Sequence, residues 1–143
     1  MKGRTTLLLA AALSTAAITL AAGNASSTVT PKPDVKWSDA GIPGVSSAAV
    51  QGDMKSGPSH FYLRYAAGFV APLHHHTADH YVTTISGLLV LSVDGVEHRL
   101  PPGSYFALLG GKPHAGRCEG SEACVMFVDA RAPWDVVPEP PAK

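Results

Sequence analysis

The sequence predicts an all-β fold, arranged as an antiparallel sandwich or barrel. Runs of five to seven residues either alternate apolar with polar side chains or are rich in β-branched and aliphatic residues. Glycine and proline separate these runs at intervals typical of short strands joined by turns. We find no convincing amphipathic helix in the chain, which argues against the helix-containing fold classes.

Five such runs predict strands. HFYLRY, starting at residue 60, alternates apolar with polar residues, and this indicates one buried face and one exposed face. In LLVLSV, starting at residue 88, aliphatic residues dominate, and the Asp94-Gly95 pair that follows predicts a tight hairpin turn. The five expected strands cover residues 60–65, 80–86, 88–93, 105–109 and 124–130.

Residues 1–25 have the features of a secretory signal peptide. Lys2 and Arg4 precede a mostly apolar run over residues 7–22, and small residues then lead to Ala25, after which we expect cleavage. The alternative is a membrane anchor, but the run is shorter than the roughly 20 apolar residues of a spanning helix. We therefore expect a secreted or periplasmic protein with no membrane span after cleavage.

The remainder is long enough for one domain. Removing 25 of 143 residues leaves 118, which fits a single core. Residues 26–36 are polar with two prolines, which predicts a flexible lead-in. We expect the folded domain to cover residues 37–136. Residues 137–143 are rich in proline, which predicts an extended, loosely held tail.

The charge balance argues against a nucleic-acid partner. The whole chain has 11 basic and 11 acidic residues, and two of the basic ones lie in the signal peptide, so the mature chain has 9 against 11, a formal charge of −2. It shows neither a basic stripe nor a block of like charge.

Cys118 and Cys124 are the only cysteines, and they predict a disulfide. Five residues that include Gly120 separate them, which indicates a hairpin loop between two strands. Cysteines facing each other across such a pair are within disulfide reach, and an extracytoplasmic compartment would keep them oxidised. The alternative is a pair of reduced thiols acting as soft metal ligands.

Four of the seven histidines fall within seven positions, residues 74–80. On a strand, His74 and His76 project from one face while His75 points away, and His80 follows four residues later. His114 lies beyond another expected strand, after a Gly-Pro turn. Imidazoles converging on one point suit zinc, copper, iron or nickel, and manganese less naturally. The alternative is a metal-attracting surface tract; we treat the remaining histidines, His60, His75 and His98, as surface or packing groups.

Two motifs resemble those of the cupin superfamily. The first runs from Gly68 through His74-x-His76 and His80 to Gly87, and the second from Gly95 through Pro101-x-Gly103 to His114. The resemblance covers roughly residues 58–130. The chain is also similar to small secreted single-domain cupins. It implies a jelly-roll β-barrel (the double-stranded β-helix) whose metal ligands are His74, His76, His80 and His114.

Two positions depart from the family pattern. His80 stands where these motifs usually have glutamate, as in a subset of small microbial cupins with an all-histidine site. Cys118 stands where an asparagine often closes the second motif, consistent with the expected disulfide. Four neutral ligands would leave a divalent ion its full charge of +2. Possible neighbours of the ligand shell are Tyr62, Asp79, Tyr81 and Tyr105, although strand phase does not show which of them face inward.

The resemblance leaves the reaction open, because fold does not fix chemistry. The first hypothesis is a metal-dependent oxidoreductase of dioxygenase type acting on a small oxygenated molecule. The second is a non-catalytic extracytoplasmic module that binds a metal or a small ligand, and the third, weaker one is a metal-free sugar-binding or sugar-modifying cupin. We also expect a homodimer, since small cupins commonly pair.

Overall fold

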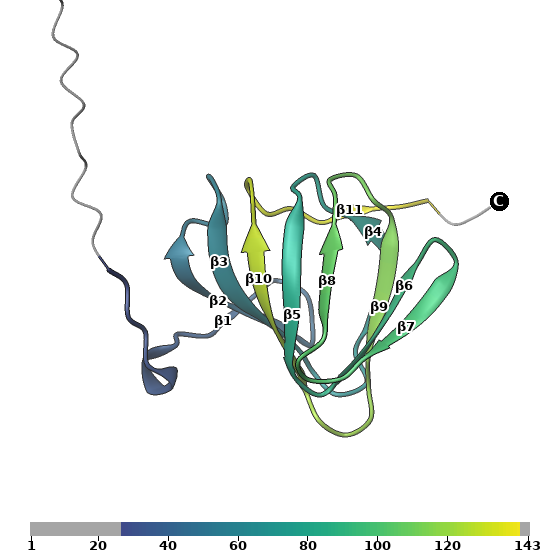
Figure 1. The fold of residues 1–143 in the computed structure, drawn as a ribbon, viewed down its shortest axis with the longest axis horizontal. Coiled ribbons are helices and arrows are strands. Elements are labelled where there is room, and N and C mark those ends of the chain that lie inside the picture. Colours follow the sequence, from purple (N-terminus) through teal and green to yellow (C-terminus); the bar gives the residue numbers. More distant parts are fainter. Residues whose placement is uncertain (1–26, 141–143) are drawn as a thin grey trace, which may run out of the picture.

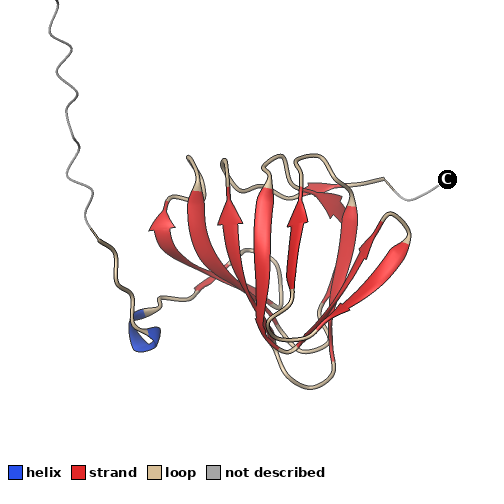
Figure 2. Cartoon of the chain, viewed as in Figure 1, coloured by secondary structure: helices blue, strands red, loops and turns tan. Residues whose placement is uncertain are grey.

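The computed structural model describes residues 27–140, which form two antiparallel sheets (Figure 1). The six-stranded sheet contains, in spatial order, β1 (Ser38–Asp39), β2 (Val45–Gly52), β3 (Ser59–Tyr65), β10 (Cys124–Ala130), β5 (His80–Ser86) and β8 (Tyr105–Leu108). The five-stranded sheet contains β11 (Val137–Pro138), β4 (Val70–His75), β9 (His114–Glu119), β6 (Leu88–Val93) and β7 (Val96–Leu100). One 3₁₀ turn, η1 (Lys32–Asp34), is the single helical element of the described chain (Figure 2). The expected signal peptide lies outside the described residues.

The connectivity is that of a jelly roll. From β3 to β6 each successive strand changes sheet, and the same happens from β7 to β10. Neighbours within a sheet are therefore mostly distant in sequence, as β3 and β10 are. The all-β fold class and the jelly-roll architecture are confirmed. The backbone hydrogen bonds of the described residues form the two facing sheets of this fold.

All five expected strands exist, and three of them have the expected limits: β5, β6 and β10. The Asp94-Gly95 hairpin is also confirmed, because Val93 pairs with Val96 across a two-residue turn. Both turn residues have positive φ, 54° and 75°, as the favoured two-residue hairpin turn requires. The other six strands, β1, β2, β4, β7, β9 and β11, are not among those expected from the sequence.

The core lies between the two sheets. β10 alternates strictly, with every second residue from Cys124 to Ala130 buried. Phe61 from β3 and Leu89 from β6 belong to one core cluster and are almost completely buried, at 0% and 2% exposure. Each sheet thus turns one apolar face inward, which is what a period-2 pattern dictates.

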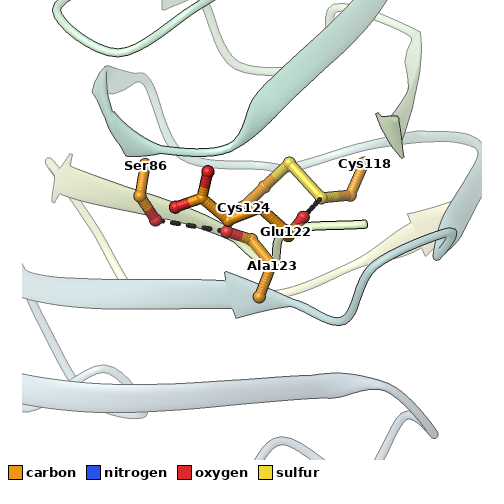
Figure 3. The surroundings of a disulfide bond; sticks show 5 residues. All are labelled: Ser86, Cys118, Glu122, Ala123 and Cys124. Carbon is orange, nitrogen blue, oxygen red and sulfur yellow. Dashed lines mark hydrogen bonds between the residues drawn. A yellow bond between two sulfur atoms is a disulfide. The ribbon is translucent and has the colours of Figure 1, made fainter. Parts of the chain in front are cut away.

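The disulfide forms as predicted, but the hairpin expected around it does not. Cys118 and Cys124 are bonded, with Cα atoms 5.6 Å apart (Figure 3). β9 and β10 do not pair with each other: β9 lies between β4 and β6, and β10 between β3 and β5. The short loop instead crosses from one sheet to the other. The bond therefore links the two sheets across the core.

The proline-rich segment is held more firmly than the sequence suggests. Val137 and Pro138 form β11 at the edge of the five-stranded sheet, paired with His75 and His74. The backbone N–H of Glu139 donates to the carbonyl of Leu73, and its carboxylate lies 2.5 Å from the Nδ1 atom of His75. Proline is compatible with such an edge strand because an edge leaves one side of the backbone unpaired.

Within residues 27–140, no helix has the length and apolar character needed to cross a membrane.

Candidate metal centre

The two sheets bring four histidines together at one end of the core. His74 lies on β4, His76 directly follows that strand, and His80 and His114 are the first residues of β5 and β9. His74 and His114 are register partners within the five-stranded sheet. His80 comes from the opposite sheet, where it pairs with Ala130. All four are buried, with exposures between 3% and 6%.

Three of the rings have the spacing of a metal site. Ligand nitrogens of His74, His76 and His114 all lie within 4.8 Å of one another. The His80 ring centroid is 4.8 Å from that of His76 and 5.8 Å from that of His114. The His80 ring thus lies beside the three-histidine group. The nitrogens of His74, His76 and His114 are close enough together to be candidate ligands of one metal ion.

Each ring has the same tautomer, because each Nδ1 atom lies against a backbone carbonyl. A carbonyl can only accept, so the Nδ1 atom must carry the proton. The carbonyls belong to Pro72 for His74 (2.7 Å), Asp135 for His76, Ala78 for His80 (3.1 Å) and Lys112 for His114 (2.9 Å). Four Nε2 lone pairs therefore remain free inside a buried space. Metal-ligating histidines are typically oriented in this way.

Two loops that carry ligands are fastened to each other. The backbone N–H of Gly111 donates to the carbonyl of His76 (2.9 Å), and the N–H of Gly110 donates to the Asp79 carboxylate (2.7 Å). A Cβ atom at Gly110 would lie 2.2 Å from the carbonyl oxygen of Thr77, so only glycine permits this approach. Asp79 therefore has a structural role beside the site: its carboxylate links the loop before His80 to the loop before His114.

The C-terminal segment fixes His76. The Asp135 carbonyl accepts a hydrogen bond from the Nδ1–H group of His76. The Asp135 carboxylate accepts two more, from the Thr77 backbone N–H (2.8 Å) and from the Thr77 hydroxyl (2.5 Å). Trp134 stacks on the His76 ring at 3.8 Å between centroids and 24° between planes. It also meets the His80 ring edge-on at 5.2 Å. Sequence reasoning gave neither Trp134 nor Asp135 a part in the site; a lone tryptophan next to a proline in an otherwise polar segment was the available signal.

The pKa values of all four histidines lie below the ordinary value. Burial is the main cause in each case, since an imidazolium would lose its hydration there. The pKa of His76 falls to about 3 and that of His114 to about 4, with neighbouring histidines adding repulsion. The cluster is accordingly neutral at physiological pH, which is the form that binds metals.

The four rings line a cavity of about 40 Å³. Apart from them and Gly116, its walls are apolar or aromatic side chains, among them Leu91, Phe106 and Met126. No carboxylate, lysine or arginine belongs to the described lining. The arrangement can hold a cation, but its walls offer no side-chain general base except the histidines themselves.

The other candidate residues lie outside the cavity. Tyr62 is out of phase with Phe61 and Leu63, so it faces the outer side of β3, against Phe127 and Trp37. Tyr105 is 62% exposed on the edge strand β8. The ring of Tyr81 lies beneath the Arg131 guanidinium.

The three histidines left out of the expected ligand set do not join the cluster. His75 contacts Glu139, and His60 contacts Gln51 and Asp129. His98 is exposed on β7.

Comparison with known protein families identifies the fold. A family model described as a cupin domain matches residues 61–129. This part of the chain is a cupin domain. The resemblance carried by the two motifs is thus confirmed. No curated protein matches the chain significantly.

Several solved structures share the fold at low sequence identity. The polyketide cyclase RemF from Streptomyces resistomycificus has 17% identity and a TM-score of 0.67, covering 82% of this chain and 89% of its own. KdgF from Halomonas sp. has 18% identity and a TM-score of 0.63, covering 74% and 94%. An oxalate oxidase has 18% identity and a TM-score of 0.58, covering 71% and 59%. At such identities the likeness establishes the fold alone.

Proposed function

We propose that this cupin domain binds one divalent transition metal through His74, His76 and His114, with His80 as a fourth ligand. A single observation carries the proposal: four Nδ1–H groups are bound to carbonyls, so four Nε2 lone pairs face one buried apolar cavity. Neutral imidazoles whose Nδ1–H group is held by a carbonyl are typical ligands of zinc and related cations. Zinc, iron, copper, nickel and manganese are the candidate ions.

We further propose a metal-dependent oxidoreductase of dioxygenase type that acts on a small oxygenated molecule. When bound, a cation with only neutral ligands supplies strong polarisation of an oxygen group. The protein's part is to hold four rings in one tautomer and to surround them with apolar walls. Two structural relatives are named as enzymes, a polyketide cyclase and an oxalate oxidase, which supports an enzymatic role.

The competing candidate is a non-catalytic module that binds a metal or a small ligand. One observation favours it: no carboxylate among the described residues lines the cavity, so proton transfer would depend on the histidines or on the bound molecule. Small anions separate the two candidates. Azide should change the absorption spectrum of the cobalt-loaded protein if a coordination position is open, as catalysis requires. A spectrum insensitive to azide would favour the binding module.

The ligand assignment is tested by metal analysis of four purified variants. We expect His76→Ala and His114→Ala to lose most of the bound metal, because each removes one of three closely spaced nitrogens. His75→Ala and His98→Ala are the matched controls, since both change a histidine outside the cluster. Equal metal content in all four would refute the assignment.

We also propose that the protein is exported. The Cys118–Cys124 disulfide supports this, since such bonds persist in oxidising compartments. N-terminal sequencing of protein recovered from the extracytoplasmic fraction should begin at Ser26. An intact Met1 in that fraction would contradict the cleavage assignment.

A further inference from the structure

A second, larger cavity adjoins the histidines. It is a groove of about 800 Å³ between the end strands of the two sheets. β1 and β2 with their connecting turn form one wall, and β4 with residues 134–138 forms the other. Nothing in the proposed metal chemistry needs so large a space, because the histidine cavity measures only about 40 Å³.

The groove is continuous with the histidine site. Both cavities share wall residues from β3, β4 and the C-terminal segment, namely Leu63, Tyr65, Ala71, His74, His76 and Trp134. His74 and His76 thus form the boundary between the two spaces. Trp134, which stacks on His76, borders both. A molecule lying in the groove would place one of its ends beside the histidine cluster.

The walls of the groove are mainly apolar, and its charges are mainly negative. Large apolar side chains on both sides are partly open to water, with 39% exposure at Ile42, 43% at Leu73 and 45% at Val136. Its charged lining residues are three carboxylates, Asp39, Asp53 and Asp135, against the single ammonium of Lys55. An anionic body would be repelled there, whereas an uncharged apolar body would cover the exposed side chains.

From these observations we propose the class of ligand: an elongated molecule with an uncharged apolar body in the groove and an oxygen-donor head beside His74 and His76. The inference rests on the proposed metal site, since the head group is placed by it. The groove has the volume of a site for a drug-sized ligand. A two-carbon acid would leave almost all of it empty.

Straight-chain hydroxamic acids test the proposal, because their head group chelates metals and their chain length can be varied. The probes are the two-carbon and the eight-carbon acids, titrated into cobalt-loaded protein and followed by absorbance. Six additional methylenes, each half buried, should tighten binding about two-fold apiece, or roughly 60-fold in all. Ile42→Asp and Ala49→Asp change exposed groove residues and should abolish most of this gain, without weakening the two-carbon acid. Val96→Asp, at a 52% exposed apolar residue outside the groove, should keep the gain.

The possible outcomes are distinct. Equal affinity of the two acids would overturn the groove assignment and leave the metal site intact. An unchanged spectrum with the two-carbon acid would overturn the open metal position, and the head-group placement with it. The two acids could also bind with equal affinity to a protein that is dimeric and that Ile42→Asp makes monomeric. That result would show that a second copy of the chain covers the groove, and it would also overturn the proposal.

Discussion

Acidification should destabilise the metal-free protein well before its carboxylates titrate. His76 and His114 have pKa values of about 3 and about 4 in the folded protein, against an ordinary value of about 6.5 in the unfolded chain. Between pH 6.5 and these lower values the unfolded chain therefore binds protons that the folded protein does not. Stability must fall as pH falls through this window. His74 and His80 are shifted in the same direction and add to the effect.

The size of the effect follows from the pKa values of His76 and His114. At pH 5 an unfolded histidine lies about 1.5 pH units below its pKa, and each unit corresponds to about 1.36 kcal/mol. Both folded histidines are still almost fully neutral at that pH. Each thus costs about 2 kcal/mol between pH 7 and pH 5, and the pair about 4 kcal/mol. This is a large part of the 5–15 kcal/mol typical of a domain.

Urea unfolding of chelator-treated protein at pH 7 and pH 5 measures this loss. His114→Gln should reduce the difference by about 2 kcal/mol, since glutamine does not titrate. His98→Gln, at an exposed position on β7, should leave the difference unchanged. A pH dependence identical in the wild type and in His114→Gln would show that the buried cluster is not neutral, and the reasoning would be refuted.

Three further predictions concern the surroundings of the site and the core. Replacing both Cys118 and Cys124 by alanine should cost about 2 kcal/mol in urea unfolding, because the closed loop is short; an unchanged midpoint would contradict this. Asp135→Ala should weaken metal binding about 10- to 100-fold in a chelator competition, because it removes both bonds to Thr77 that hold the Asp135 carbonyl against His76, whereas Thr77→Ser keeps the hydroxyl and should bind normally; equal affinities would argue against positioning by Asp135. Phe61→Ala should cost about 3–5 kcal/mol, because the ring is fully buried; a loss below 1 kcal/mol would contradict that packing.

Local patterns predicted the strands but not their partners. Residues 80–86 and 124–130 were recognisable because β-branched and alternating apolar residues follow the strand period. Their pairing depends on contacts between residues far apart in sequence, which no local pattern contains. The loop between Cys118 and Cys124 shows the difficulty: a short glycine-containing connection is as compatible with a change of sheet as with a hairpin, and here it changes sheet.

For the site, the sequence predicted the residues that carry the chemistry better than those that support it. His74, His76 and His114 could be singled out because histidine spacing and the two motifs coincide, and the structure brings all three together. Trp134 and Asp135 lie some 60 residues after His76, and their contacts with it arise only from the fold. Tyr62 was considered because tyrosine is a possible proton donor, but strand phase turns it away from the cavity.

The two ends of β9 and β10 have different roles. At one end Cys118 and Cys124 covalently set the distance between the sheets. At the other end β9 begins with the ligand candidate His114, and β10 ends at Ala130, the register partner of His80. Closure at the disulfide end therefore does not depend on the loops around the cavity mouth. Apart from the fastened positions at Asp79 and Gly110, those loops should tolerate changes of composition, so this scaffold is suited to acquiring new ligand preferences without losing its fold.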